Sequence, residues 1–175
     1  AAGGTFNLGG FSTTVGRLAG AGTINLGSAS LTTGGDNTST TFAGVITGSG
    51  GRVKTGTGTL TLSGANTYTG TTTISNGYLI AGDDQAFGNA VSDIVFRNNV
   101  FSQILASGTR TISRSFINTA TANIQSLGGL DAGAKLFSGN VNLSTRGMSL
   151  TSFVGGDTTF SGLISGGFGI QKEGN

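Results

Sequence analysis

The chain has 175 residues, a net charge of +2, 34 glycines and no proline, cysteine or histidine. Charged residues make up 9% against a usual share near ~25%, so nucleic-acid binding, which needs clustered cations, is not expected. The missing residue types exclude disulfides and zinc–thiolate sites, imidazole metal ligands and a serine–histidine–aspartate triad. Direct membrane insertion is not expected either, because no apolar run approaches ~18 residues.

Strands are predicted along the whole chain. Glycines interrupt nearly every window long enough for a helix, and each interior glycine costs about 1 kcal/mol relative to alanine. Short runs rich in threonine, valine, isoleucine, leucine and phenylalanine, bounded by turn residues, predict strands instead. In chain order these are Thr23–Leu26, Ser30–Thr33, Thr40–Val45, Thr59–Ser63, Thr71–Ser75, Tyr78–Ala81, Asp93–Phe96, Ser102–Leu105, Arg110–Ser113, Ala122–Ile124, Lys135–Phe137, Asn140–Leu143, Ser149–Thr151 and Thr158–Leu163.

Strands this closely spaced are compatible with three folds: a sandwich, an antiparallel barrel or a parallel β-helix. Asn76-Gly77 alone is typical of a type I′ hairpin turn, but beside the internal repeat we interpret it as a corner between parallel turns. An internal repeat favours the β-helix, because residues 42–57 align without a gap on residues 160–175. Their separation corresponds to about five or six coils of ~20 residues. We therefore define repeat-like regions at 40–82 and 158–175 and interpret the second as a truncated copy.

Residues 56–82, GTGTLTLSGANTYTGTTTISNGYLIAG, resemble the passenger-associated transport repeat of bacterial autotransporters, a type V secretion family. The matching elements are GTGTLTLSG, NTYTGTTTI and NGYLIAG, and segments 16–35, 40–56, 83–89 and 106–116 fit the same family. One departure is Arg52-Val53 before Lys54, where the repeat more often continues with an apolar residue. The resemblance implies a right-handed parallel β-helix that lies outside the cell or on the bacterial outer-membrane surface, and a repeat that aids secretion and folding.

The expected fold is accordingly an all-β, right-handed parallel β-helix of about eight or nine coils, with residues 1–175 as a single segment of a longer passenger. Side chains alternate in and out of such a coil, so Leu60 and Leu62 are expected to point into the core. Ile74 and Leu79 are expected to stack in one column, and Asn66 to occupy a corner that needs positive φ. The core stack is expected to include Phe42, Phe96, Phe116, Phe137 and Phe160.

No residue is predicted to be catalytic, cofactor-binding or metal-binding, and no cofactor is expected. Asp83-Asp84 is expected to form a polar turn, because adjacent carboxylates rarely converge as glycosidase acid and base do. The loop at 48–54 lacks the Gly-Lys-Ser/Thr order of a phosphate-binding loop. Tyr68 and Tyr78 are candidates for a carbohydrate-stacking face, although packing is their commoner role. Turn contacts are expected for Asp36, Asp93, Asp131 and Asp157.

The expected function is that of a structural, non-enzymatic stalk segment of a secreted or surface-displayed adhesin-like protein, which aids export and folding and presents adhesive regions. Two alternatives remain open. One is a polysaccharide-binding or polysaccharide-active β-helix, which needs carboxylates and cations that converge on one face. The other is a self-assembling extracellular fibre subunit, whose end turns expose unpaired backbone groups. The expected partners are thus further copies of the chain and a host-surface or matrix ligand.

Overall fold

The structure is a computed structural model that describes residues 3–89, 92–97, 101–121, 125–152 and 156–174. These residues form strands and no helix, so none of them belongs to a helix that could cross a membrane. In chain order the strands are β1 (Thr5–Asn7), β2 (Thr13–Val15), β3 (Thr23–Asn25), β4 (Leu31–Thr33), β5 (Thr40–Phe42), β6 (Val45–Thr47), β7 (Arg52–Lys54), β8 (Thr59–Leu62), β9 (Thr72–Ile74), β10 (Gly77–Ala81), β11 (Ile94–Phe96), β12 (Ser102–Ala106), β13 (Arg110–Ile112), β14 (Phe116–Asn118), β15 (Gln125–Gly129), β16 (Lys135–Phe137), β17 (Val141–Leu143), β18 (Met148–Ser152), β19 (Thr158–Phe160), β20 (Ile164–Gly166) and β21 (Ile170–Gly174).

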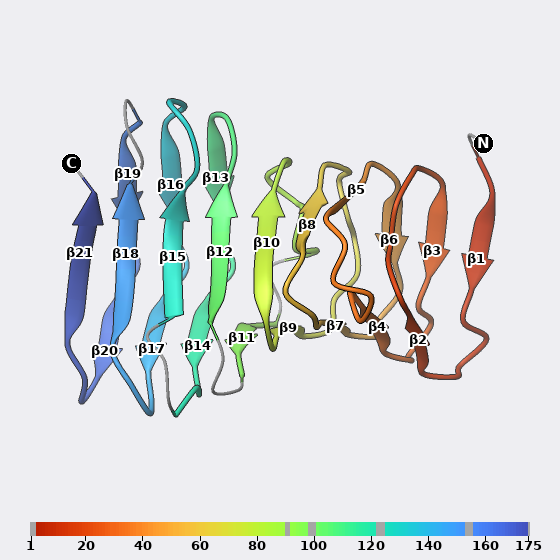
Figure 1. Cartoon of the computed structure of the whole chain (residues 1–175), viewed down its shortest axis with the longest axis horizontal. Coiled ribbons are helices and arrows are strands. Elements are labelled where there is room, and N and C mark those ends of the chain that lie inside the picture. The colour runs from red at the N-terminus through yellow and green to blue at the C-terminus, as the bar shows by residue number, and fades with distance from the viewer. Residues whose placement is uncertain (1–2, 90–91, 98–100, 122–124, 153–155, 175) are drawn as a thin grey trace.

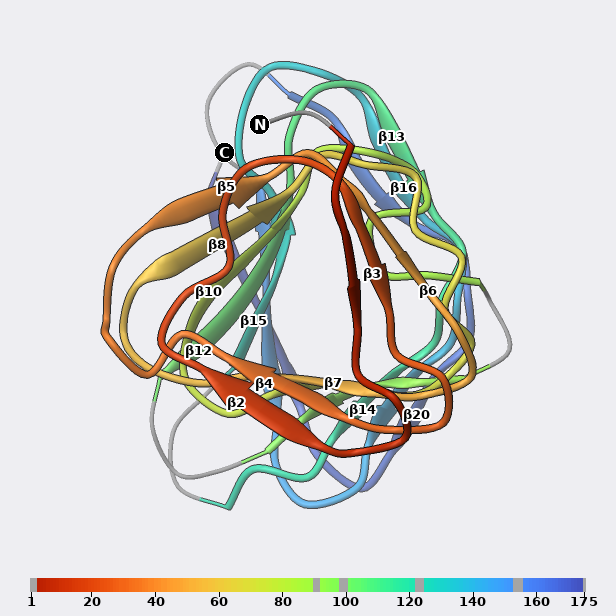
Figure 2. The same cartoon turned by 90° about the vertical axis from the view of Figure 1, so that its right-hand side faces the viewer.

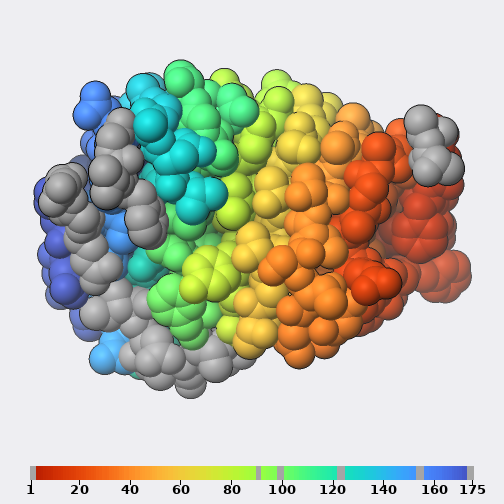
Figure 3. Space-filling model, turned by 45° about the horizontal axis from the view of Figure 1, so that its top comes forward, coloured from red at the N-terminus to blue at the C-terminus, as the bar shows by residue number. Residues whose placement is uncertain are grey.

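The strands stack into parallel sheets along one elongated coil, in which each stretch of chain lies beside the next (Figures 1 and 3). One sheet, the eight-stranded face, has the order β2-β4-β7-β9-β11-β14-β17-β20, and the seven-stranded face runs from β5 to β21. The third side of the triangular cross-section, the third face, carries two three-stranded sheets, β1-β3-β6 and β13-β16-β19 (Figure 2). Viewed from the N-terminal end the chain runs clockwise as it recedes, so the coil is right-handed (Figure 2). The predicted right-handed parallel β-helix is therefore confirmed.

Most turns are longer than the ~20 residues expected, so fewer of them fit. Seven turns separate β2 from β20 on the eight-stranded face. The register advances from Thr13 to Leu31 in the first of these turns but from Phe116 to Val141 in a later one. The chain consequently makes about seven turns rather than eight or nine.

Most predicted strands occur within two residues of their expected bounds. The predicted strand Thr40–Val45 is an exception, because it forms two strands, β5 and β6, on different faces. Gly44 turns the chain there at a point where a Cβ atom would lie 2.1 Å from the carbonyl oxygen of Gly22. Similarly, Thr158–Leu163 ends as a strand at Phe160, whereas Ala122–Ile124 lies outside the described residues. The sequence pattern missed β1, β2, β7, β14, β15, β20 and β21.

Leu60 and Leu62 point into the core as predicted, and both are almost completely buried. They pair in register with Leu79 and Ala81 of the next turn. The predicted shared column of Ile74 and Leu79 is wrong, because Ile74 lies on the eight-stranded face and Leu79 on the seven-stranded face. The chain turns between these faces at Asn76-Gly77, where Gly77 has a φ of 74°. This pair is therefore a corner of the coil and not a hairpin.

The predicted phenylalanine stack is also present. Phe42, Phe96, Phe116 and Phe137 are buried, and Phe160 packs against the core. The rings of Phe116 and Phe137 meet edge to face with centroids 5.8 Å apart, and those of Phe137 and Phe160 stack at 5.1 Å. Aromatic contacts thus continue from the eight-stranded face onto the third face.

The two repeat-like regions form the same succession of strands one face apart. In the first, β5, β6 and β7 lie on the seven-stranded, third and eight-stranded faces, whereas β19, β20 and β21 lie on the third, eight-stranded and seven-stranded faces. The repeated sequence therefore specifies a spacing of strands and corners, and not a particular face.

Successive turns approach most closely at glycine corners, and this closeness can be tested. A Cβ atom at Gly50 would lie 1.8 Å from the carbonyl oxygen of Ala29, whereas one at Gly35 would meet nothing within 4 Å. We expect Gly50→Ala to lower the free energy of unfolding by about 2 kcal/mol or more, because neither backbone can yield freely. Gly35→Ala should change it by less than about 0.5 kcal/mol. Denaturant unfolding followed by circular dichroism measures both, and equal effects would contradict the packing described.

Candidate functional site

The third face has no strand in two successive turns between β6 and β13. There residues 63–71 and the described residues of 82–93 lead from the seven-stranded face to the eight-stranded face without joining a sheet. We call this region the third-face gap. Some backbone hydrogen bonds still join successive turns in the gap, such as those from the Thr67 amide to the Ile46 carbonyl and from the Asn89 amide to the Tyr68 carbonyl. Buried backbone polar groups must be paired, and side chains pair further groups there.

Asn66 supplies side-chain hydrogen bonds of this kind in the first of the two turns. Its buried side chain accepts a hydrogen bond from the amide of Ile46 at 2.8 Å and donates one to the carbonyl of Ala86 at 2.6 Å. One amide side chain thus connects three successive turns. The prediction that Asn66 needs positive φ is wrong, because among the described non-glycine residues it is Asn37 that has this conformation, with φ of 63°.

Arg114 lies in the corner that follows β13, and its side chain forms hydrogen bonds with the second turn of the gap. Its side chain is 3% exposed, so the guanidinium is held inside the coil. The group donates hydrogen bonds to four backbone carbonyls, those of Gly70, Phe87, Ser92 and Asp93. These carbonyls belong to two different turns, so one planar group ties both of them to the turn that contains β13.

Tyr68 lies completely buried beside this guanidinium. The Cζ atom of Arg114 is 5.9 Å from the centroid of the Tyr68 ring, which is within cation–π range. The Tyr68 hydroxyl forms a 2.6 Å hydrogen bond with Oγ1 of Thr72. Tyr68 therefore packs the interior of the gap and offers no surface for a ligand.

The buried charges of the coil all have the same sign. Among the described residues Arg52, Lys54, Arg114 and Lys135 are buried, and no carboxylate is. The Lys54 ammonium donates to the carbonyls of Thr55, Gly56 and Asn76 at 2.6, 2.9 and 3.3 Å. Burial, followed by the charge of Arg52, lowers the pKa of Lys54 to about 8.

Lys135 has the one buried ammonium that meets a carboxylate in the described part of the chain. Its Nζ lies 2.7 Å from Oδ1 of Asp131, whose carboxylate also accepts from the Ser107 hydroxyl at 2.6 Å and the Gly108 amide at 2.8 Å. Hydrogen bonds from Lys135 and then Ser107 hold the pKa of Asp131 well below its usual range. Asp131 was predicted to make a turn contact, and it also bridges two turns.

Asp83-Asp84 forms the predicted polar turn, and the two carboxylates serve different partners. Asp83 accepts from the amide of Gln85 at 2.8 Å, whereas Asp84 accepts from the amide of Thr111 at 3.1 Å. Asp84 also borders a hollow of about 300 Å³ beside the third-face gap. The lining of that hollow comprises Asp84, Gln85, Gly88, Asn89, Thr111, Ser113 and Arg114.

This hollow contains one carboxylate beside one cation, whereas glycoside hydrolysis needs two carboxylates. The described part of the chain also has no group of three or more histidine, cysteine, aspartate or glutamate side chains that could hold a metal ion. Tyr68 and Tyr78 do not form one carbohydrate-stacking face. Tyr78 is half-buried on the seven-stranded face, where its ring lies 5.5 Å from that of Phe101.

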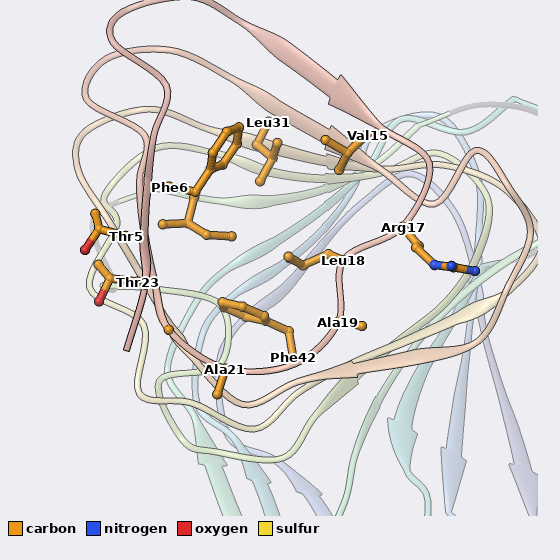
Figure 4. Close-up of a pocket in the computed structure, with 13 residues that line it drawn as sticks. Thr5, Phe6, Val15, Arg17, Leu18, Ala19, Ala21, Thr23, Leu31 and Phe42 are labelled. Atoms are coloured by element: carbon orange, nitrogen blue, oxygen red, sulfur yellow. The ribbon is translucent and has the colours of Figure 1, made fainter. Parts of the chain in front are cut away.

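A second hollow, of about 460 Å³, opens at the N-terminal end of the coil. Phe6, Leu18, Leu31 and Phe42 point into it, whereas Arg17 points away (Figure 4). It is the interior of the first turns seen from the end, and its lining is mainly apolar.

The sequence pattern did not identify Arg52, Lys54 and Arg114 as interior residues, because isolated charges normally lie in solvent. One signal was present for the first two. Arg52 and Lys54 are two positions apart in a three-residue strand, so both side chains point to the same side. Val53 between them then points the other way, and the structure places Arg52 and Lys54 inside.

The lowered pKa of Lys54 predicts how stability depends on pH. The unfolded chain binds its proton up to about pH 10.5, whereas the folded chain releases it near 8. Between these values the unfolded state binds more protons, so stability should rise with pH across this window. Lys54→Met should lose that rise, and Lys172→Met on the exposed surface should keep it. Chemical unfolding at pH values between about 7 and 10 measures the difference, and parallel curves for the wild type and Lys54→Met would refute it.

A comparison with known protein families shows which strands of the coil resemble the passenger repeat. The family model described as passenger-associated-transport-repeat matches residues 53–81. No curated protein and no solved structure matches the chain significantly. The matched segment begins in β7, contains β8 and β9 and ends with β10, and it includes Lys54, Asn66 and Tyr68. The passenger-repeat segment of this chain therefore supplies strands to both long faces and the first turn of the third-face gap.

Proposed function

We propose that the chain is a structural, non-catalytic part of the stalk of an adhesin-like passenger, which is exported by type V secretion and lies at the bacterial surface or outside the cell. The observation that supports this most is the match of residues 53–81 to a passenger-associated repeat in the middle of a continuous parallel coil. In this role the coil aids export and folding and holds adhesive regions away from the membrane.

The architecture supports a role in folding during export. Each turn of a solenoid contacts its neighbours, so folding can propagate turn by turn once a first turn has formed. The repeat segment presents β8 and β10 on one face and β7 and β9 on another, which gives the next turn two templates. Once these turns have folded outside the outer membrane, the chain could not easily slide back across it, so folding would favour export.

The placement of charge supports a structural role over a catalytic one. Three buried cations, on Lys54, Arg114 and Lys135, are engaged with backbone carbonyls of the coil. The outward positions of β8 are occupied by Thr59 and Thr61, which suit a strand surface. These buried cations and outward threonines are all accounted for by the stability of the coil.

Substitutions within β8 test the stalk proposal. Asp at both Leu60 and Leu62 would place carboxylates in the core at a cost of roughly 3 kcal/mol or more each, so these turns should unfold and surface display should fall. Thr61→Asp is the matched control, since this side chain lies between them and points outward. Display of the chain on bacterial cells can be measured by antibody labelling and flow cytometry. Undiminished display of the double variant, or an equal loss in Thr61→Asp, would count against the proposal.

We also propose that copies of this chain associate end to end. The hollow of Figure 4 opens at one end, and Leu163, Phe168 and Ile170 are between 46% and 68% exposed at the other. The outermost strands at the two ends, such as β2 and β21, are each paired on one side. Parallel docking of one end on the other would cover the apolar side chains and continue the sheets.

Light scattering coupled to size exclusion tests this association. We expect the mass of the chain to increase with concentration, and the double variant Leu163→Ser/Phe168→Ser to remain at the monomer mass. Phe101→Ser is the control, because this exposed ring lies on the side of the coil beside Tyr78 and should leave association unchanged. A wild-type chain that stays monomeric at high concentration would rule the proposal out.

A further inference from the structure

The hollow beside the third-face gap presents several polar side chains that are free to bind a ligand. Its lining includes Asp84, Gln85, Thr111 and Ser113, all of them exposed. The side-chain amide of Gln85 and the hydroxyls of Thr111 and Ser113 form no hydrogen bond in the described part of the chain. The hollow has a volume of about 300 Å³, and concave surfaces from about this size upward with convergent polar groups are typical of ligand sites.

Asp84 is held in this hollow by the open edge of β13. Within its sheet β13 pairs with β16 alone, and Arg110 and Ile112 make the hydrogen bonds on that side. The amide of Thr111 therefore faces the gap, where it donates to Oδ1 of Asp84 at 3.1 Å. The carboxylate is thus fixed in place, and its other oxygen is available to accept a hydrogen bond from a ligand.

A second hollow, of about 280 Å³, continues the first across the following turns, and Thr111 lines both. Thr111 stands in register with Leu136 on β16 and Thr159 on β19, and these three side chains point outward from the third face. Leu136 offers an apolar contact among the polar groups. We call the two hollows together the third-face groove.

The cations that line the third-face groove are already engaged with the protein. Arg114 donates to four backbone carbonyls, Arg110 to two, and Lys135 to the carboxylate of Asp131. Asp84 would repel an anionic ligand. A suitable ligand must instead donate to a carboxylate and, at neighbouring positions, exchange hydrogen bonds with an amide and with hydroxyls. Adjacent hydroxyl groups of a sugar ring meet both demands, because each is a donor and an acceptor.

We propose that the third-face groove binds a neutral oligosaccharide, which is held by Asp84 and Gln85 at one end and packs on Leu136 further along. A ligand longer than one sugar ring is expected, because Thr111, Leu136 and Thr159 lie on three turns spaced about 4.8 Å apart. The proposal goes beyond the stalk function, since this segment would itself be an adhesive region and not only the support of one.

The groove is suited to binding and not to cleavage. Its second hollow contains Asp157, which lies three turns beyond Asp84, a separation of about 14 Å at the spacing of parallel strands. The two carboxylates of a glycosidase are at most about 9.5 Å apart. We therefore expect the oligosaccharide to be recovered intact.

Isothermal titration calorimetry with neutral oligosaccharides tests the proposal. The probes are maltohexaose, cellohexaose and the hexamer of N-acetylglucosamine, which differ in linkage and substituents, and the wild-type chain should bind at least one of them. Asp84→Asn should weaken this binding about tenfold or more, because a charged acceptor is replaced by a neutral one. Absence of binding to every probe at millimolar concentration would overturn the proposal.

Asp36→Asn is the matched control, since Asp36 is an exposed carboxylate that accepts from a backbone amide outside the groove, and this variant should bind as the wild type does. Gln85→Ala is a second test, because it removes an exposed side chain that makes no hydrogen bond in the described part of the chain, and it should weaken binding even if Asp84→Asn fails to fold. Wild-type affinity in both groove variants would refute the proposal. Tighter binding of a heparin-derived hexasaccharide, unchanged in Asp84→Asn, would also refute it.

Nuclear magnetic resonance locates the bound oligosaccharide. Titration should shift the amide resonances of Thr111, Ser113 and Leu136, and shifts confined to the eight-stranded face would contradict the proposed site. Asp84→Asn should leave surface display unchanged in the assay used for the Leu60 and Leu62 variants. A failure of oligosaccharide binding is thereby distinguished from a failure of the stalk function.

Discussion

The hydrogen bonds between successive turns are the constraint on which the rest of this structure depends. Parallel strands must lie about 4.8 Å apart, so every part of a turn, including its corners, has to approach the turn before it that closely. At corners such as Gly50 and Gly56 a Cβ atom would lie 1.8 Å from a carbonyl oxygen of the adjacent turn. The abundance of glycine and the absence of proline follow from the same requirement, since proline cannot donate to a ladder.

The third-face gap shows what happens when the ladder is interrupted. The amide of Asn66 has the donor and acceptor of a peptide group, so it can continue the pairing from Ile46 to Ala86 where no strand does. Arg114 performs the larger task with a planar group that reaches four carbonyls. Asn66 of the passenger-repeat segment and Arg114 beyond it are in this sense part of the core.

Strand positions were predictable from the sequence because alternation is a local property. Leu60 and Leu62 alternate with threonines, and this pattern alone places them inside. The face that each strand joins is not local, since it depends on how far a corner turns the chain. Ile74 and Leu79 were therefore assigned to one column although the corner at Asn76-Gly77 separates them. The number of turns was overestimated for a related reason, because loop residues lengthen a turn without changing its strands.

The sign of the buried charges has a physical cause. A coil with an interrupted ladder leaves carbonyl oxygens without partners, and these attract cations and repel carboxylates, so the interior accepts lysine and arginine selectively. Lys54, Arg114 and Lys135 each satisfy carbonyls at corners or in the gap. Arg52 differs because it is held in the middle of a strand paired on both sides by β4 and β9, where backbone carbonyls already have partners. The same ladder that stabilises the coil thus deprives this cation of the backbone acceptors that the other three use, and the side chain that favours its charge is that of Tyr68.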